Sequence, residues 1–193
     1  PYMCYVCWHA TGLKNERKKH LNYTCSSVEC FVTEAQLYYF ARCMMIERIK
    51  RLIRQNDMCV LATCHKGQPH CSLMAYLADE KAATIYMATR KETSKYKYLV
   101  ENPRVSLLID TRTEKDLKKR AEIQALTISG ICTPVADPAK ADLIRRQIVE
   151  HQPHLSALVE HPDAAIIEVH IESFLLLDGA MTAYHVTRSD MQP

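Results

Sequence analysis

Three strand-like segments joined by short turns constrain the fold of this chain more than any other feature. They are MCVLATCH (58–65), HCSLMAYLA (70–78) and ATIYMAT (83–89). The connecting segments KGQP and DEKA are short and polar, and the first contains the turn residues Gly67 and Pro69. Consecutive strands joined by such short turns pair antiparallel. The segment therefore predicts an antiparallel meander.

One helical segment precedes this meander, and further strands alternate with helices after it. Strand patterns are RVSLLID (104–110), IQALTISGICTPV (123–135) and AAIIEVHIESFLLLDG (164–179). Helical patterns occupy residues 46–54, the segment before Asn102, the segment after Asp137, and HLSALVEH (154–161). Gly130 indicates a bulge or bend in its strand. The order αβββαββααβ predicts a mainly β (β+α) fold, a six-stranded antiparallel split β-barrel with flanking helices.

The overall composition excludes several classes of protein. Hydrophobic residues make up 48% and charged residues 24%, enough for a packed core and unlike disordered or collagen-like chains. A net charge of +3 is too small to indicate a nucleic-acid partner. No apolar run reaches the roughly 18 residues of a membrane span, and the first residues lack a secretory pattern. We therefore expect a cytoplasmic protein with neither a nucleic-acid nor a membrane partner.

The nine cysteines are concentrated at the N-terminal end. Five lie in the first 43 residues, and four of the residues there have the spacing C-x2-C-x12-H-x4-C of a small zinc site: Cys4, Cys7, His20 and Cys25. Between the ligand pairs only Trp8 and Leu13 could form a small core. Three interpretations stay open: a zinc site, a loosely ordered extension, or a leader outside the functional protein.

The cysteine distribution also suggests a division into domains. We expect a cysteine-rich extension over residues 1–43, a folded domain over 44–182 and a tail over 183–193. An odd number of cysteines favours free thiols or metal ligands over a disulfide framework. The later cysteines are expected to be small apolar strand residues: Cys59, Cys64, Cys71 and Cys132.

The junction TRKETSKYKYLVENP has the composition of an anion-binding site. Thr89 and Glu92 have the spacing of a capping box, which predicts a helix beginning at Thr89. Cations and hydroxyls would then converge with free backbone N–H groups at the helix start, from Arg90, Lys91, Thr93, Ser94 and Lys95. A phosphate monoester would be held there by both charge and helix dipole. The alternative is an ordinary solvated first turn.

At this point the chain resembles a known family. The segment from Pro69 to Asp110 resembles the pyridoxamine 5'-phosphate oxidase-like family of FMN-binding split β-barrels. The resemblance covers about residues 46–179 and rests on the order of CVLAT, Ala88-Thr89, Ser94-Lys95, ENPRVSLLID and Ser129-Gly130.

The resemblance implies a set of FMN-binding residues. The phosphate ligands fall on Thr89, Ser94 and Lys95. The flavin contacts fall on the strand Ser72, Leu73, Met74 and Ala75. Ala88, Arg90, Lys91 and Thr93 complete the candidate set.

This chain departs from the family's oxidases in two places. Ser94-Lys95 stands where they often have Arg-Lys, so Arg90 or Lys91 would have to supply the second cation. Their C-terminal arginine segment is reduced here to Arg188, so oxidation of vitamin B6 is not expected.

The resemblance also implies a homodimer with the cofactor at the subunit interface. It agrees with strands that carry more apolar surface than one small barrel needs. The implied function is an FMN-dependent oxidoreductase with an unidentified small-molecule substrate or NAD(P)H as partner, and no catalytic residue is predicted. The alternative is a non-catalytic flavin- or haem-binding stress or storage protein, and a deazaflavin could replace FMN. His65 and His70 flank the first hairpin, either as exposed turn residues or facing the cofactor.

Overall fold

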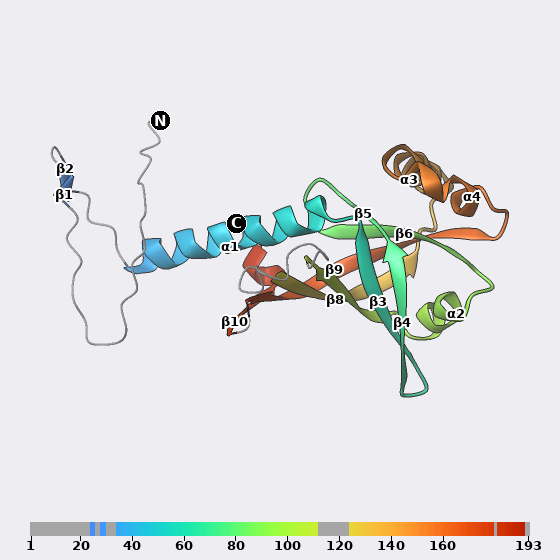
Figure 1. The fold of residues 1–193 in the computed structure, drawn as a ribbon, viewed down its shortest axis with the longest axis horizontal. Helices are drawn as coiled ribbons and strands as arrows, with labels where there is room; N and C mark the ends of the chain where they lie inside the picture. The colour runs from blue at the N-terminus through green and yellow to red at the C-terminus, as the bar shows by residue number, and fades with distance from the viewer. Residues whose placement is uncertain (1–23, 26–27, 30–33, 112–123, 180, 192–193) are drawn as a thin grey trace. The chain divides into compact units, whose positions relative to one another are not determined.

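The computed structural model describes residues 24–25, 28–29, 34–111, 124–179 and 181–191 (Figure 1). The chain divides into two compact units, residues 1–39 and 40–193. The first unit contains the antiparallel pair β1 (Thr24–Cys25) and β2 (Val28–Glu29) and the start of helix α1 (Glu34–Gln55). Cys4, Cys7 and His20 lie outside the described residues, so the zinc site stays a prediction.

The second unit is built on one antiparallel sheet of eight strands. These are β3 (Met58–His65), β4 (Gln68–Ala75), β5 (Leu77–Ala78), β6 (Thr84–Arg90), β7 (Arg104–Asp110), β8 (Gln124–Pro134), β9 (Ala164–Asp178) and β10 (Thr182–Thr187). Their order is β4-β3-β7-β8-β9-β6-β5, and β10 also pairs with β9. The predicted mainly β split-barrel fold with flanking helices is confirmed.

The number of strands differs from the six predicted. The segment 70–78 is split because Tyr76 leaves the ladder: its N–H donates to the carbonyl of Asp57 at 2.8 Å and its hydroxyl donates to the carbonyl of Ile53. The second additional strand, β10, is mostly exposed, and of its six residues only Val186 is buried. A strand with so little buried surface shows no apolar alternation for sequence analysis to detect.

Helices pack against both faces of the sheet, and each covers only part of it (Figure 1). The buried face of α1 joins the main core inside the curled sheet through Ile46, Ile49 and Ile53. Helix α2 (Ser94–Glu101) contributes Leu99 to the same core. A second cluster packs α3 (Pro138–His151) and α4 (Ser156–Val159) against β6 and β9. Short 3-10 turns complete the unit at Pro153–Leu155 and Arg188–Met191.

Two local predictions about helices are tested by the structure. The helix after Asp137 begins as predicted, because the Asp137 carboxylate accepts the N–H of Ala139 at 3.0 Å and Pro138 occupies the first turn. Helix α1 is longer than the predicted 46–54. Arg48 of this helix pairs with Asp178 of β9 at 2.6 Å, and Arg42 pairs with Asp190. Within the described residues, no helix is both long enough and apolar enough to cross a membrane.

Strand β9 pairs with three strands. Its first half pairs with β6, its second half with β10, and β8 follows nearly its whole length. The register with β8 shifts between Ser129 and Gly130. A Cβ atom added at Gly130 would lie 2.5 Å from the carbonyl oxygen of His170 and 2.9 Å from Cγ1 of Val169. The predicted irregularity at Gly130 is confirmed, and its cause is close backbone approach.

We expect Gly130→Ala to destabilise the protein by about 2 kcal/mol or more, because the methyl group would overlap backbone that two ladders hold in place. Urea unfolding followed by circular dichroism measures this change. Ser129→Ala, at the exposed neighbouring position, is the control and should cost less than about 0.5 kcal/mol. Equal unfolding midpoints for Gly130→Ala and the wild type would contradict the packing described here.

Candidate functional site

The turn between β6 and α2 differs in one respect from the prediction. Thr89 is not the helix N-cap, because it pairs with Ala165 in the β6–β9 ladder, and the ladder continues to Arg90. The helix begins at Ser94, with Thr93 in the extended conformation of an N-cap residue. The capping-box prediction is therefore wrong, since tertiary strand pairing extends β6 over the first two residues of the expected helix.

Hydroxyl groups converge at this turn. Thr93 Oγ1 donates to the carbonyl of Arg90 at 2.7 Å and lies 3.3 Å from Oγ1 of Thr89. The Thr89 side chain is almost completely buried. The hydroxyl of Thr93 bonds to no backbone N–H of α2, so the helix has no side-chain cap. The hydroxyl groups of the two threonines thus lie close together beside a helix start that no side chain caps.

The first turn of α2 offers donors to an anion. The N–H groups of Ser94, Lys95 and Tyr96 precede the first intrahelical bond, which runs from the N–H of Lys97 to the carbonyl of Thr93 at 3.2 Å. No acidic residue lies in this turn. The half-buried Lys95 adds a cation to the positive end of the helix dipole. Together these groups can bind a phosphate.

The remaining candidate residues of this junction, Ala88, Arg90 and Lys91, do not belong to this group of donors. Strand alternation puts Ala88 and Arg90 on the opposite face of β6 from Thr89, and Ala88 packs into the cluster under α3 and α4. Arg90 forms an ion pair with Glu92, while its buried Nε has no hydrogen-bond partner among the described residues. Lys91 is exposed. The structure therefore brings together Thr89, Thr93, Ser94 and Lys95, and not the side chains of Arg90 and Lys91.

The predicted flavin segment lies at the end of the sheet. Strand β4 pairs with β3 alone, so its other edge has no strand partner among the described residues. Met74 points into the main core, and Leu73 on the opposite face is 71% exposed. Ser72 and Ala75 are half-buried. The unpaired backbone groups of this edge and the exposed side chain of Leu73 can contact a flat, partly polar ring such as that of a flavin.

Gln152 is a site candidate that the sequence did not reveal. It follows α3, is 6% exposed, and its Nε2 donates to the carbonyl of Tyr76 at 2.9 Å. Its Oε1 is buried and has no hydrogen-bond partner among the described residues. Tyr76 directly follows the flavin segment, so this unpaired acceptor lies beside it. A single glutamine between two helices carries no motif, and only the fold shows its position.

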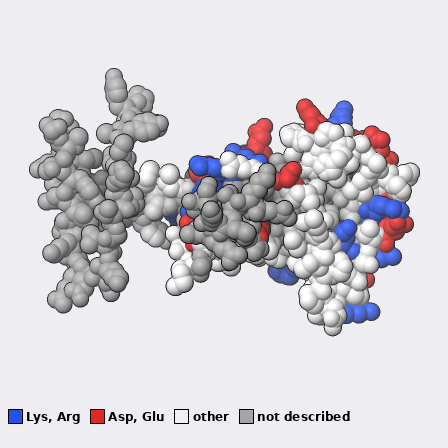
Figure 2. All heavy atoms as spheres, in the orientation of Figure 1, with Lys and Arg blue, Asp and Glu red and all other residues white. Residues whose placement is uncertain are grey.

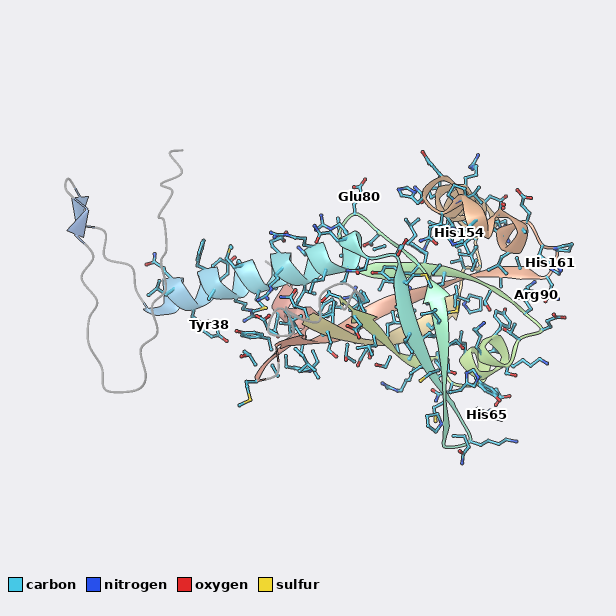
Figure 3. All side chains as sticks on the ribbon, in the orientation of Figure 1. Tyr38, His65, Glu80, Arg90, His154 and His161 are labelled. Carbon is cyan, nitrogen blue, oxygen red and sulfur yellow. The ribbon has the colours of Figure 1, made fainter. Side chains whose placement is uncertain are left out.

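The histidines of the first hairpin lie against α2. The ring of His65, which is labelled in Figure 3, stacks on Tyr98 with ring centroids 4.6 Å apart. Its Nδ1 lies 2.8 Å from a carboxylate oxygen of Glu101. His70 is exposed, and its ring lies nearly perpendicular to that of Tyr98, with the ring centroids 6.0 Å apart. Across the described residues, no three His, Cys, Asp or Glu side chains form a group that could hold a metal.

Two of the described cysteines in the sheet, Cys59 and Cys132, are buried. Burial raises the pKa of the Cys59 and Cys132 thiols to about 12, so both are protonated at neutral pH. These two are apolar core residues, as predicted. Cys64 and Cys71 also lie in strands, as expected, but Cys64 is half-buried and Cys71 is exposed.

Comparison with known proteins matches residues 45–178 to the family described as pyridoxamine 5'-phosphate oxidase. A pyridoxamine 5'-phosphate oxidase homologue of Schizosaccharomyces pombe is 30% identical over 159 residues, which cover 68% of this chain and 84% of that protein.

Solved structures share the fold at lower identity. A haem-binding protein of Mycobacterium smegmatis has a TM-score of 0.66 and 14% identity, over 76% of this chain and 59% of that one. An FAD-binding protein of Mesorhizobium loti has a TM-score of 0.54 and 19% identity, over 67% and 91% of the two chains.

Proposed function

Because the chain belongs to the pyridoxamine 5'-phosphate oxidase family, we propose that its barrel domain binds FMN, with the phosphate at the turn between β6 and α2. The observation that carries this proposal is the start of α2, which no side chain caps and whose own first turn contains no acidic residue. Ser94 and Lys95 would bind the phosphate through backbone N–H groups and side chains, and Thr89 and Thr93 would border it. The FAD-binding relative in fold supports a flavin.

The groups near β4 suit the flavin ring. The free edge of β4 offers backbone donors and acceptors, and the buried Oε1 of Gln152 lacks a donor. Leaving such an acceptor unsatisfied costs about 1–3 kcal/mol, so a ligand donor there would be stabilising. A bound flavin would supply hydride and electron transfer, while these residues would orient the ring and limit water.

We also propose that a second copy of the chain covers the outer face of β4, β3 and β7. Leu73 lies opposite Val60, and Val60 lies opposite Leu108, so the three form a row across this face. Leu73 is 71% exposed and Leu108 is 37% exposed. In Figure 2 the surface over β3 and β4 is mostly uncharged. Since Leu73 belongs also to the flavin segment, the cofactor would lie at the subunit interface.

Haem binding is the competing function, supported by the haem-binding relative in fold. The turn before α2 supports the flavin proposal, because its hydroxyl and N–H groups and Lys95 suit a phosphate, which FMN carries and haem lacks. A deazaflavin has a phosphate as well and would use the same turn. The free thiols of the described cysteines fit a reducing compartment, and we propose the cytoplasm.

Lys95→Ala should weaken FMN binding by about 1.5–3 kcal/mol, the contribution of one charge-assisted hydrogen bond, and leave riboflavin binding unchanged. Fluorescence titration with FMN and with riboflavin measures both affinities. The exposed Lys97→Ala is the matched control. Equal losses for the two ligands, or no loss for FMN, would show that Lys95 does not bind the phosphate.

Leu73→Asp should shift a dimer towards monomer, because a charge would be buried in the proposed interface. Light scattering after gel filtration gives the mass of each variant. The control is Leu143→Asp, which changes an exposed leucine on α3 instead of one on the sheet. This variant should stay dimeric. A monomeric wild type, or a Leu73→Asp variant that dimerises normally, would refute this interface.

We propose that the FMN-loaded chain is an oxidoreductase, so anaerobic addition of NADPH should bleach the flavin absorption band. NADH serves as the second donor. A band that neither nucleotide bleaches would instead indicate a flavin-binding protein without turnover by these donors.

A further inference from the structure

Asp163 makes two hydrogen bonds to the backbone of the proposed phosphate-binding turn. Its carbonyl accepts the N–H of Lys91 at 3.0 Å, and its Oδ2 accepts the N–H of Glu92 at 3.1 Å. We propose that Asp163 is a positioning residue, which holds this turn so that the start of α2 faces the phosphate. The proposal rests on the proposed function and adds a residue remote in sequence to that site.

The fold brings Asp163 to this place through strand pairing. Arg90, the last residue of β6, lies opposite Ala164, the first residue of β9. Asp163 therefore stands beside the point where the chain leaves the sheet, and the next two N–H groups after Arg90 meet its acceptors. Figure 3 shows Arg90 and His161 near one another at this end of the sheet.

The connection from β6 to α2 depends on these bonds. It comprises only Lys91, Glu92 and Thr93. The N–H and hydroxyl of Thr93 donate to the carbonyl of Arg90, the same hydroxyl lies 3.3 Å from that of Thr89, and the carbonyl of Thr93 accepts the N–H of Lys97. The partners in these bonds all belong to β6 or α2, the two elements that the connection joins. Asp163 fixes it to β9, and through Thr93 it sets the direction of the N–H groups that follow.

Asp163 is held in its turn by His161. The N–H of Asp163 donates to Nδ1 of His161 at 3.1 Å, and the N–H of Ala164 donates to the carbonyl of His161 at 2.8 Å. The half-buried aspartate is thus oriented before any ligand arrives. Such preorganisation lowers the conformational entropy that a ligand must remove on binding.

The negative charge of Asp163 is itself unfavourable near a phosphate. The residue therefore contributes by accepting hydrogen bonds and not by its charge. Asparagine keeps an acceptor for the N–H of Glu92 and removes the charge, whereas alanine removes the acceptor. The two substitutions separate the positioning effect from the electrostatic one.

The test compares Asp163→Ala and Asp163→Asn with the wild type in titrations with FMN and riboflavin. Asp163→Ala should raise the FMN dissociation constant about tenfold and change that of riboflavin by less than about twofold. Asp163→Asn should bind FMN at least as tightly as the wild type. Asp142→Ala, an exposed aspartate on α3, is the matched control.

A ratio of FMN to riboflavin affinity that stays unchanged in Asp163→Ala would overturn the proposal. The amide NMR signals of Thr93 to Tyr96 give a second readout without ligand: they should shift in Asp163→Ala and stay nearly unchanged in Asp163→Asn. Unshifted signals in Asp163→Ala also overturn the positioning role. If the wild-type chain binds FMN no more tightly than riboflavin, the proposed function is wrong. The role of Asp163 is still tested in that case, because the NMR comparison needs no ligand.

Discussion

The pairing of β9 with its neighbours is the constraint on which the rest of the structure depends. One end of β9 lies against β6, and this contact brings Asp163 to the turn that begins the candidate phosphate site. At the other end, Asp178 accepts hydrogen bonds from Arg48 of α1 and Gln124 of β8. Gly130 allows β8 to follow β9 through the shift in register. The core and the site therefore share one scaffold.

The parts of the fold that bury an apolar face were predictable from the sequence. β3, β7 and β9 carry that signal, and the proline after Asp137 marks a helix start. β10 carries none because almost all of it is exposed. The start of α2 was misplaced because the local pattern of Thr89 and Glu92 favours a capping box, while the pairing of β6 with β9 adds long-range hydrogen bonds that favour a strand.

The residues of the candidate site also divide into those that the sequence could predict and those that it could not. Thr89, Ser94 and Lys95 lie within one short segment, so resemblance to a family could select them together. Gln152 and Asp163 act on segments 76 and 71 residues away along the chain. No local pattern records such contacts. Arg90 lies on the other face of β6 from Thr89, whereas Lys95 is the second residue of α2 and directly follows Ser94.

The most direct test of the account is a competition between FMN and haemin for the purified chain, followed by absorption spectroscopy. The account predicts saturable FMN binding with a perturbed flavin band, and little displacement by haemin at equal concentration. A chain that leaves the FMN spectrum unchanged, or that forms a haem complex and releases FMN, would contradict the assignment of the turn between β6 and α2 as a flavin phosphate site.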